Sequence, residues 1–257
     1  MGAKLRAWLE WSGDLALFCW RILRDAPRRP REGAEIARQI FEAGWRSLPL
    51  ITAAGFAVGA VMSMHTRASL ERFGAEALIP AGLALALFKE TGPLVTGLLF
   101  AGRVGAGIGA ELGAMRVSEQ IDALESLAVD SFKFLVVTRV AACVLVLPIL
   151  TTVMNFTGIL GGFLAETAIS GMSFSLYWER AWSLVDFTDY VPATLKTCVF
   201  GFIVGSVASY LGYNTTGGTA GVGQASTRTV VLTSILLIVT NVVLVKAIFF
   251  LFPAARG

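Results

Sequence analysis

The chain has 257 residues, of which 55% are hydrophobic and only 15% are charged. Soluble domains carry about 25% charged residues, whereas the few charges here are grouped between long apolar stretches. A bilayer core about 30 Å thick is crossed by a helix of roughly 20 apolar residues, and several uncharged stretches approach or exceed that length. The composition therefore excludes a soluble globular protein and predicts an all-α integral membrane protein.

The remaining composition argues against catalysis by this chain. The net charge is only +3, and most basic residues lie in the first 47 positions beside membrane spans, so no nucleic-acid partner is expected. The three cysteines lack metal-ligand spacing, the single histidine excludes an H-E-x-x-H site, and no lysine follows a glycine as a Walker A motif requires. No G-x-S-x-G elbow occurs. We therefore expect no catalytic residue, no metal and no cofactor bound by this chain.

Residues 1–47 are predicted to lie at the membrane surface. The first 33 residues mix tryptophan with arginine, and both favour the head-group level. From Ala34 to Leu48 the apolar residues fall on one half of a helical wheel and the charged residues on the other. This pattern predicts an amphipathic interfacial helix that turns into the membrane near Pro49.

Residues 48–257 are predicted to form one membrane domain with about five spans. The uncharged stretches place these spans at approximately 48–64, 78–102, 140–165, 192–213 and 229–252. The stretch 170–190 could hold a further short helix. Fourteen Lys and Arg residues fall on the side of the N-terminus and four on the other side, so the positive-inside rule predicts a cytoplasmic N-terminus.

Lys89 and Glu90 interrupt the second span. Neighbouring residues point about 100° apart on a helix, so these two side chains cannot simply neutralise each other. A charge in the middle of a span costs about 3 kcal/mol and therefore faces a bundle interior, a wet cavity or a ligand head group. One interpretation is structural ion pairing with Arg103, Asp186 or Lys196, and the other is a functional site. Lys196, near a span end, is expected to extend toward the head groups.

A short helix is predicted in the polar stretch between spans 2 and 3, with Ser118 as its N-cap. Its wheel places apolar residues on one side and acidic residues on the other. The apolar face could lie on lipid, but anionic lipid would repel an acidic helix, so the pattern favours a protein partner with a receptive groove. The candidate docking residues are Glu119, Gln120, Ile121, Asp122, Ala123, Leu124 and Glu125.

Glycines four residues apart recur in or near the spans, as at 55 and 59, 158 and 162, and 201 and 205. Such small residues permit close approach of helix backbones. We interpret them as packing within one subunit in preference to a seam between two subunits.

Several ordered motifs resemble the MlaE/YrbE permease family, the membrane subunits of ATP-driven lipid transporters that work with MCE-domain proteins in the bacterial envelope. The motifs are K-E-T-G-P at 89–93, A-G-R-V-G-A at 101–106, A-E-L-G-A-M-R at 110–116, E-Q-I-D-A-L-E at 119–125 and G-V-G-Q-A-S-T-R-T-V-V at 221–231. The likeness spans most of the chain, and the first 45 residues contribute least to it.

The resemblance implies a homodimer in which the helix at 119–125 couples each copy to a P-loop ATPase subunit that holds ATP and Mg²⁺. It also implies that phospholipid passes through a cavity at the dimer centre, beneath a periplasmic MCE-domain protein. The path would be lined or bordered by Met62, His65, Lys89 and Glu90. The sequence departs from the expected family pattern at position 89, which is Lys in place of Arg, and at position 65, which is His in place of Gln.

On this resemblance the chain is expected to be a multi-pass permease of the bacterial inner membrane that is not itself an enzyme. It would move phospholipid between that membrane and the periplasmic carrier and so maintain outer-membrane lipid asymmetry. Two alternatives remain. An ion-coupled secondary transporter or channel would use Lys89 and Glu90 for coupling, and an intramembrane enzyme acting on lipid would need a nucleophile or metal cluster that the sequence lacks.

Overall fold

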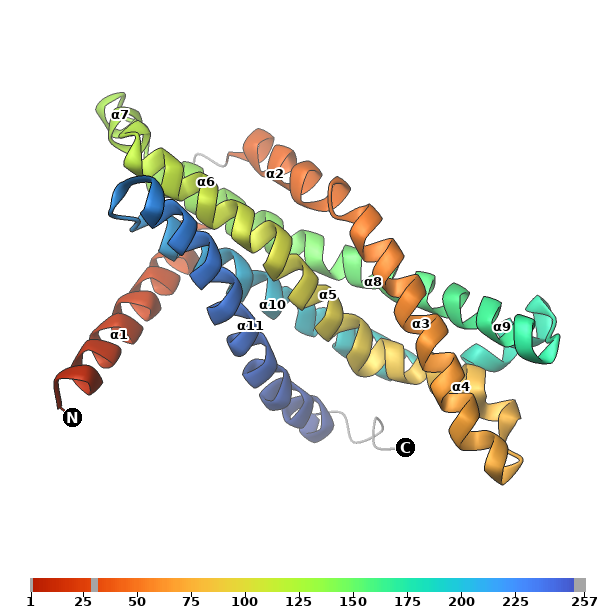
Figure 1. The fold of residues 1–257 in the computed structure, drawn as a ribbon. Helices are drawn as coiled ribbons and strands as arrows, with labels where there is room; N and C mark the ends of the chain where they lie inside the picture. The colour runs from red at the N-terminus through yellow and green to blue at the C-terminus, as the bar shows by residue number, and fades with distance from the viewer. Residues whose placement is uncertain (1, 29–31, 252–257) are drawn as a thin grey trace. The chain divides into compact units, whose positions relative to one another are not determined.

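The computed structural model describes residues 2–28 and 32–251, and every regular element within these ranges is a helix (Figure 1). Five helical stretches are long and apolar enough to cross a membrane. They are Gly33–Phe73, Glu76–Val117, Phe132–Ser170, Phe187–Tyr213 and Gly218–Ile248. The prediction of an all-α chain with about five membrane-crossing helices is confirmed.

The chain folds into two compact units, and the division falls within helices α2, α5, α8, α10 and α11. The first unit comprises 1–43, 100–145 and 201–236. Its elements begin with α1 (Gly2–Asp25) and α2 (Gly33–Trp45), followed by η4 (Ala101–Gly105), α6 (Ala106–Val117), α7 (Gln120–Ser126) and η5 (Phe132–Val137). The start of α8 (Thr138–Ser170), the end of α10 (Phe187–Tyr213) and the start of α11 (Gly218–Leu251) complete it.

The second unit comprises 44–99, 146–200 and 237–257, of which 252–257 lie outside the described residues. It contains α3 (Leu48–Leu70), η1 (Glu71–Phe73), η2 (Glu76–Leu78), α4 (Ile79–Ala86), η3 (Leu87–Thr91), α5 (Gly92–Phe100) and α9 (Phe174–Trp182), with the remaining parts of α8, α10 and α11. Helix α9 supplies the further short helix left open at 170–190. Its Tyr177 and Ala181 are buried in one apolar cluster with Leu83, Leu87 and Phe88.

Several helices extend beyond the uncharged stretches that marked the spans. Helix α3 continues past Met64 to Leu70, although Arg67 lies within this extension. Arg67 is buried because its guanidinium pairs with Glu166 of α8, and Ser63 Oγ lies 3.4 Å from the same carboxylate. Because Arg67 has a charged partner within the protein, the helix continues through this residue.

Residues 46 and 47, just before Pro49, separate α2 from α3. Helix α2 ends at Trp45 and α3 begins at Leu48, with Pro49 in its first turn. Proline is tolerated there because the first N–H groups of a helix have no intrahelical partner.

Helices α3 and α8 approach each other through glycine. A Cβ atom built on Gly59 would lie 1.8 Å from the carbonyl oxygen of Gly158, so a side chain cannot fit without moving the backbone. In the first unit, a Cβ on Gly201 would lie 2.4 Å from the Cys143 carbonyl oxygen. At both positions the small residue packs helices of one chain, as the sequence predicted.

We expect Gly59→Ala to lower the free energy of unfolding by about 1–3 kcal/mol, because the new methyl group forces α3 and α8 apart. Denaturation of the purified chain in detergent micelles measures this change.

Gly82→Ala is the matched control, since no atom lies within 4 Å of the position a Cβ would take in α4. It should be neutral or stabilise by up to about 1 kcal/mol through helix propensity. Equal destabilisation by both substitutions would contradict the close-packing account.

Candidate functional site

The K-E-T-G-P segment forms a π-helical turn, η3, inside the second span. The N–H of Gly92 donates to the carbonyl of Leu87, five residues back. Pro93 has no N–H, so the carbonyl of Lys89 receives no hydrogen bond from the residue four positions on. Gly92 is required because its Cβ would lie 1.7 Å from Asn155 Oδ1. A π turn of this kind often marks a functional position in a helix.

Lys196 of α10 donates hydrogen bonds to two acceptors of this turn, the Lys89 carbonyl and the Glu90 carboxylate. Its Nζ donates to the Lys89 carbonyl oxygen at 2.7 Å and to Glu90 Oε1 at 3.2 Å. Only 4% of Lys196 is exposed. The expectation that Lys196 extends toward the head groups is therefore wrong, because two acceptors inside the unit hold its ammonium group.

The remaining partners come from two other positions in the second unit. Lys89 Nζ lies 2.9 Å from Asp189 Oδ1, and Asn241 Nδ2 donates to Glu90 Oε2 at 2.9 Å. Of the partners considered from sequence, Lys196 is found beside Glu90, while Lys89 pairs with Asp189 in place of Asp186. Two lysines and two carboxylates give this charge cluster a formal charge of zero, which suits a site at membrane depth.

The charge cluster borders two hollows. A small cavity of about 30 Å³, room for one or two waters, is lined by Lys89, Glu90, Thr188, Asp189, Ala193, Lys196, Val245 and Ile248. An apolar groove of about 500 Å³ between α10 and α11 shares Thr188, Lys196 and Ile248 with it, and the rest of its lining is almost entirely apolar. Charged groups and a long apolar surface therefore adjoin each other within one unit.

The other two candidate residues on the lipid path differ in position. Met62 packs against the apolar cluster that contains Leu87 and Phe88, the residues just before Lys89. His65 is exposed on α3 and does not line the hollows beside the charge cluster. The structure thus brings Lys89 and Glu90 together in one site and leaves His65 apart from it.

Sequence reasoning missed Asp189 and Asn241 as members of the charge cluster. A usable signal was present for Asn241, which stands alone in a run without any charge from Thr229 to Val245. An amide in such a run needs an internal partner. Asp189 precedes the predicted fourth span, 192–213, but it lies in the first turn of α10.

The candidate coupling helix α7 begins one residue later than predicted. Ser118 is not its N-cap, because the Ser118 hydroxyl donates to the Ala114 carbonyl of α6 at 2.8 Å. Glu119 occupies the N-cap position with a positive φ of 59°. Ile121 is fully buried, whereas Asp122 is exposed and pairs with Arg116 at 2.7 Å.

Glu125 fixes the far end of α7 to two other elements of the first unit. Ser131 Oγ donates to Glu125 Oε1 at 2.6 Å, and the Tyr213 hydroxyl donates to the same oxygen at 3.3 Å. Ser131 Oγ lies 2.9 Å from the Tyr213 hydroxyl oxygen, so the single Tyr213 proton is shared between Ser131 Oγ and Glu125 Oε1. Ser131 precedes η5 and Tyr213 ends α10, so a displacement of α7 would act directly on the ends of two spans. Of the acidic face, Asp122 is solvent-exposed and pairs only within the α6–α7 region, with Arg116, whereas Glu125 is bonded to two span ends.

Within residues 2–28 and 32–251, no group of three or more His, Cys, Asp or Glu residues could hold a metal ion. The arrangement of the described residues thus consists of charged and apolar surfaces for binding, and of a short helix attached to span ends.

The fold and these surfaces define a polytopic helical membrane protein with a charged site inside its spans. The model of the family "Permease MlaE" matches residues 36–247, and the chain belongs to this permease family. A protein of Rickettsia bellii named "Probable ABC transporter permease protein" is 35% identical over 237 residues, which are 92% of each chain.

Two further relatives extend the comparison. The "Intermembrane phospholipid transport system permease protein MlaE" of Haemophilus influenzae is 32% identical over 215 residues, 83% of this chain and 82% of that protein. "Protein TRIGALACTOSYLDIACYLGLYCEROL 1, chloroplastic" of Arabidopsis thaliana is 33% identical over 207 residues, 80% of this chain and 59% of that protein. The resemblance inferred from the motifs is confirmed.

Replacing Lys196 by methionine should remove the ammonium donor from the Lys89 carbonyl and from Glu90 Oε1, while Asn241 still donates to Glu90 Oε2. Because Glu90 is partly exposed (43% of its side chain), we expect a moderate loss of about 1–3 kcal/mol in the free energy of unfolding. Unfolding of the purified chain in detergent measures it.

Lys246→Met is the matched control, since Lys246 is an exposed lysine near the end of α11. If both substitutions changed stability equally, the assigned role of the Lys196 ammonium group would be refuted.

Proposed function

We propose that this permease moves phospholipid between the bacterial inner membrane and a periplasmic MCE-type carrier, and thereby maintains outer-membrane lipid asymmetry. The observation that carries this proposal is the match to the MlaE permease family over residues 36–247, together with the phospholipid transport named for the Haemophilus relative. The working unit is two copies of this chain with a P-loop ATPase subunit, which binds ATP and Mg²⁺, and an MCE-domain protein.

The lipid path includes Lys89 and Glu90, with Met62 and His65 at its border. The charge cluster and the adjoining apolar groove support this assignment, because a phospholipid needs charged partners for its head group and apolar surface for its chains. The groove follows α10 and α11, so acyl chains would lie along spans while the head group meets Lys89, Glu90 and Lys196.

Helix α7 and Glu119 couple the chain to the ATPase. Asp122 is exposed beside its partner Arg116, and Leu127 just beyond α7 is 74% exposed, so α7 and its C-terminal end present both charge and apolar surface to a partner. The hydrogen bonds of Glu125 to Ser131 and Tyr213 would carry a movement of α7 to the spans. The excess of lysine and arginine on the side of the N-terminus supports a cytoplasmic location for α7 and the N-terminus in this proposal.

The decisive experiment reconstitutes the chain with its ATPase and MCE partners into liposomes and follows fluorescent phosphatidylglycerol. Transfer to a soluble carrier domain that requires ATP supports the proposal. The ion-coupled alternative predicts the opposite pattern: the chain alone would move its substrate when an ion gradient is imposed, and ATP would have no effect.

Asp122→Lys should abolish coupling, because a cation would replace an exposed carboxylate on the surface assigned to the ATPase and would break its ion pair with Arg116. We expect stimulated ATP hydrolysis and lipid transfer to fall about tenfold or more while the thermal stability of the chain stays within about 0.5 kcal/mol. Activity of the reconstituted complex and melting of the purified chain measure the two effects.

Glu179→Lys on α9 reverses a charge of the same kind at an exposed position outside α7. It should leave ATP hydrolysis and transfer unchanged. Full activity of Asp122→Lys would remove Asp122 from the coupling surface.

A further inference from the structure

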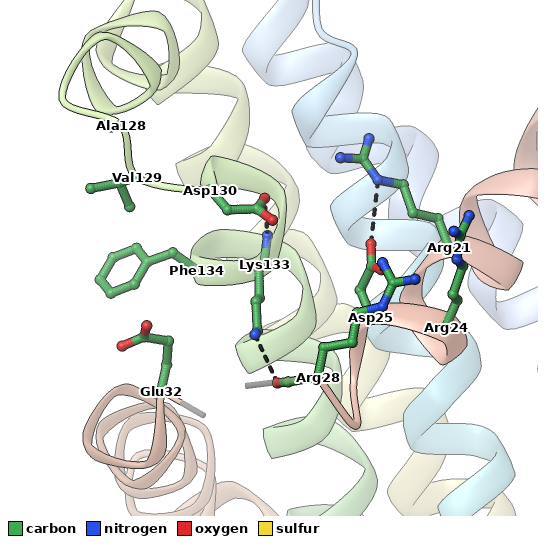
Figure 2. Close-up of a pocket in the computed structure, with 10 residues that line it drawn as sticks. All are labelled: Arg21, Arg24, Asp25, Arg28, Glu32, Ala128, Val129, Asp130, Lys133 and Phe134. Carbon is green, nitrogen blue, oxygen red and sulfur yellow. Dashed lines mark hydrogen bonds and ion pairs between the residues drawn. The ribbon is translucent and has the colours of Figure 1, made fainter. Parts of the chain in front are cut away.

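A pocket of about 550 Å³ opens in the first unit and is lined by none of the residues assigned to the lipid path, which belong to the second unit (Figure 2). The end of α1, the segment that follows α7 and the beginning of η5 form its walls. Its lining consists of Arg21, Arg24, Asp25, Arg28, Glu32, Ala128, Val129, Asp130, Lys133 and Phe134. We propose that this pocket binds the phosphodiester of a phospholipid head group, at a site separate from the transport path.

The charges of the lining fit one phosphodiester. Among the residues that the structure describes, four basic and three acidic side chains line the pocket, which leaves one surplus positive charge among them at their formal ionisation. A phosphodiester carries a single negative charge and accepts charge-assisted hydrogen bonds from arginine and lysine. Binding one such group would therefore neutralise the pocket.

Most of the basic groups are held in place before any ligand arrives. The buried Asp25 carboxylate lies 2.6 Å from Arg28 Nη1 and 3.6 Å from Arg21 Nε. The Arg21 guanidinium lies 3.9 Å from the ring centroid of Phe132. Lys133 Nζ donates to the Arg28 carbonyl at 2.8 Å, as Figure 2 shows. Because these donors are already ordered, they lose little further side-chain entropy when an anion binds.

Arg24 is the cation that remains open. Among residues 2–28 and 32–251 no hydrogen bond or ion pair engages its guanidinium, and it is exposed. Two of the acidic side chains already have partners in the protein: Asp25 pairs with two arginines, and Asp130 accepts a hydrogen bond from the backbone N–H of Lys133 at 3.1 Å. Glu32 and Asp130 can still accept hydrogen bonds from the hydroxyl groups of a glycerol head group.

The surroundings of Arg24 favour a lipid over a phosphate ion from solution. Leu17, Trp20 and Leu23 of α1 are 68%, 65% and 56% exposed. At about 100° per residue, Arg24 projects within this apolar stripe, close to the direction of Trp20. An exposed apolar stripe that carries tryptophan and arginine is typical of a helix lying at the head-group level. A soluble phosphate would gain nothing from that stripe.

The test uses the full chain in nanodiscs that contain phosphatidylglycerol with a photoactivatable diazirine near its glycerol. Peptide mapping after irradiation should place label on 17–28 and on 128–134. Arg24→Gln should reduce this label about tenfold, as loss of a charge-assisted hydrogen bond predicts. Arg6→Gln, on the same helix outside the pocket and paired only with Glu10, should leave it unchanged.

Two further arms identify the ligand. A diacylglycerol analogue with the same chains and no phosphate should label the pocket far less, and excess glycerol phosphate in solution should not displace the lipid. Label that is equal for both lipids, or that Arg24→Gln and Arg6→Gln reduce alike, would overturn the proposal. Displacement by glycerol phosphate would show that the pocket binds a soluble phosphate ester and would overturn the assignment of a lipid ligand. Because the readout is binding and not transport, failure of the proposed transport function would leave this test intact.

Discussion

The buried ammonium group of Lys196 is the interaction on which the charged site depends. In hydrocarbon an unpaired carbonyl or carboxylate costs several kcal/mol, and the K-E-T-G-P segment creates one of each. Pro93 has no N–H to donate to the Lys89 carbonyl, and Glu90 places a carboxylate inside a span. One side chain from α10 donates to both groups at 2.7 and 3.2 Å, and Asn241 donates a second hydrogen bond to Glu90, so the unusual local sequence depends on residues more than one hundred positions away.

Charged pairs at two other places join α8 to its neighbours, one pair in each unit. Near one end of α8, Arg139 lies 2.7 Å from Glu111 of α6, and near the other end Glu166 pairs with Arg67 of α3. Such pairs contribute little net stability, since desolvation offsets most of their attraction. Their effect is on register: a helix that slid by one turn would leave an uncompensated charge in an apolar setting.

The sequence was sufficient to predict the helical class and the five spans, because uncharged runs of nearly 20 residues have few other uses. It also located α7 through its two faces. It did not predict where the helices end, since Arg67 and Asp189 find partners and remain helical. Nor did it predict the charge cluster, whose members are brought together only by packing. Ser118 was misassigned because its hydroxyl can bond to the preceding helix as well as cap the following one.

The π turn at Leu87–Thr91 has one more consequence, which concerns the length of the chain. A π turn accommodates one residue more than an α turn, and each residue of a helix rotates the side chains by about 100°. Deleting any single residue here would let the span continue as a regular α-helix, and the helix before and after it would keep nearly the same relative orientation because the wide turn had absorbed the extra residue. Residues within the turn, however, would move around the helix axis by up to that angle. Lys89 and Glu90 would then face different neighbours even if both were retained. The number of residues in this segment thus determines which groups Lys89 and Glu90 contact, just as the identity of those two residues does.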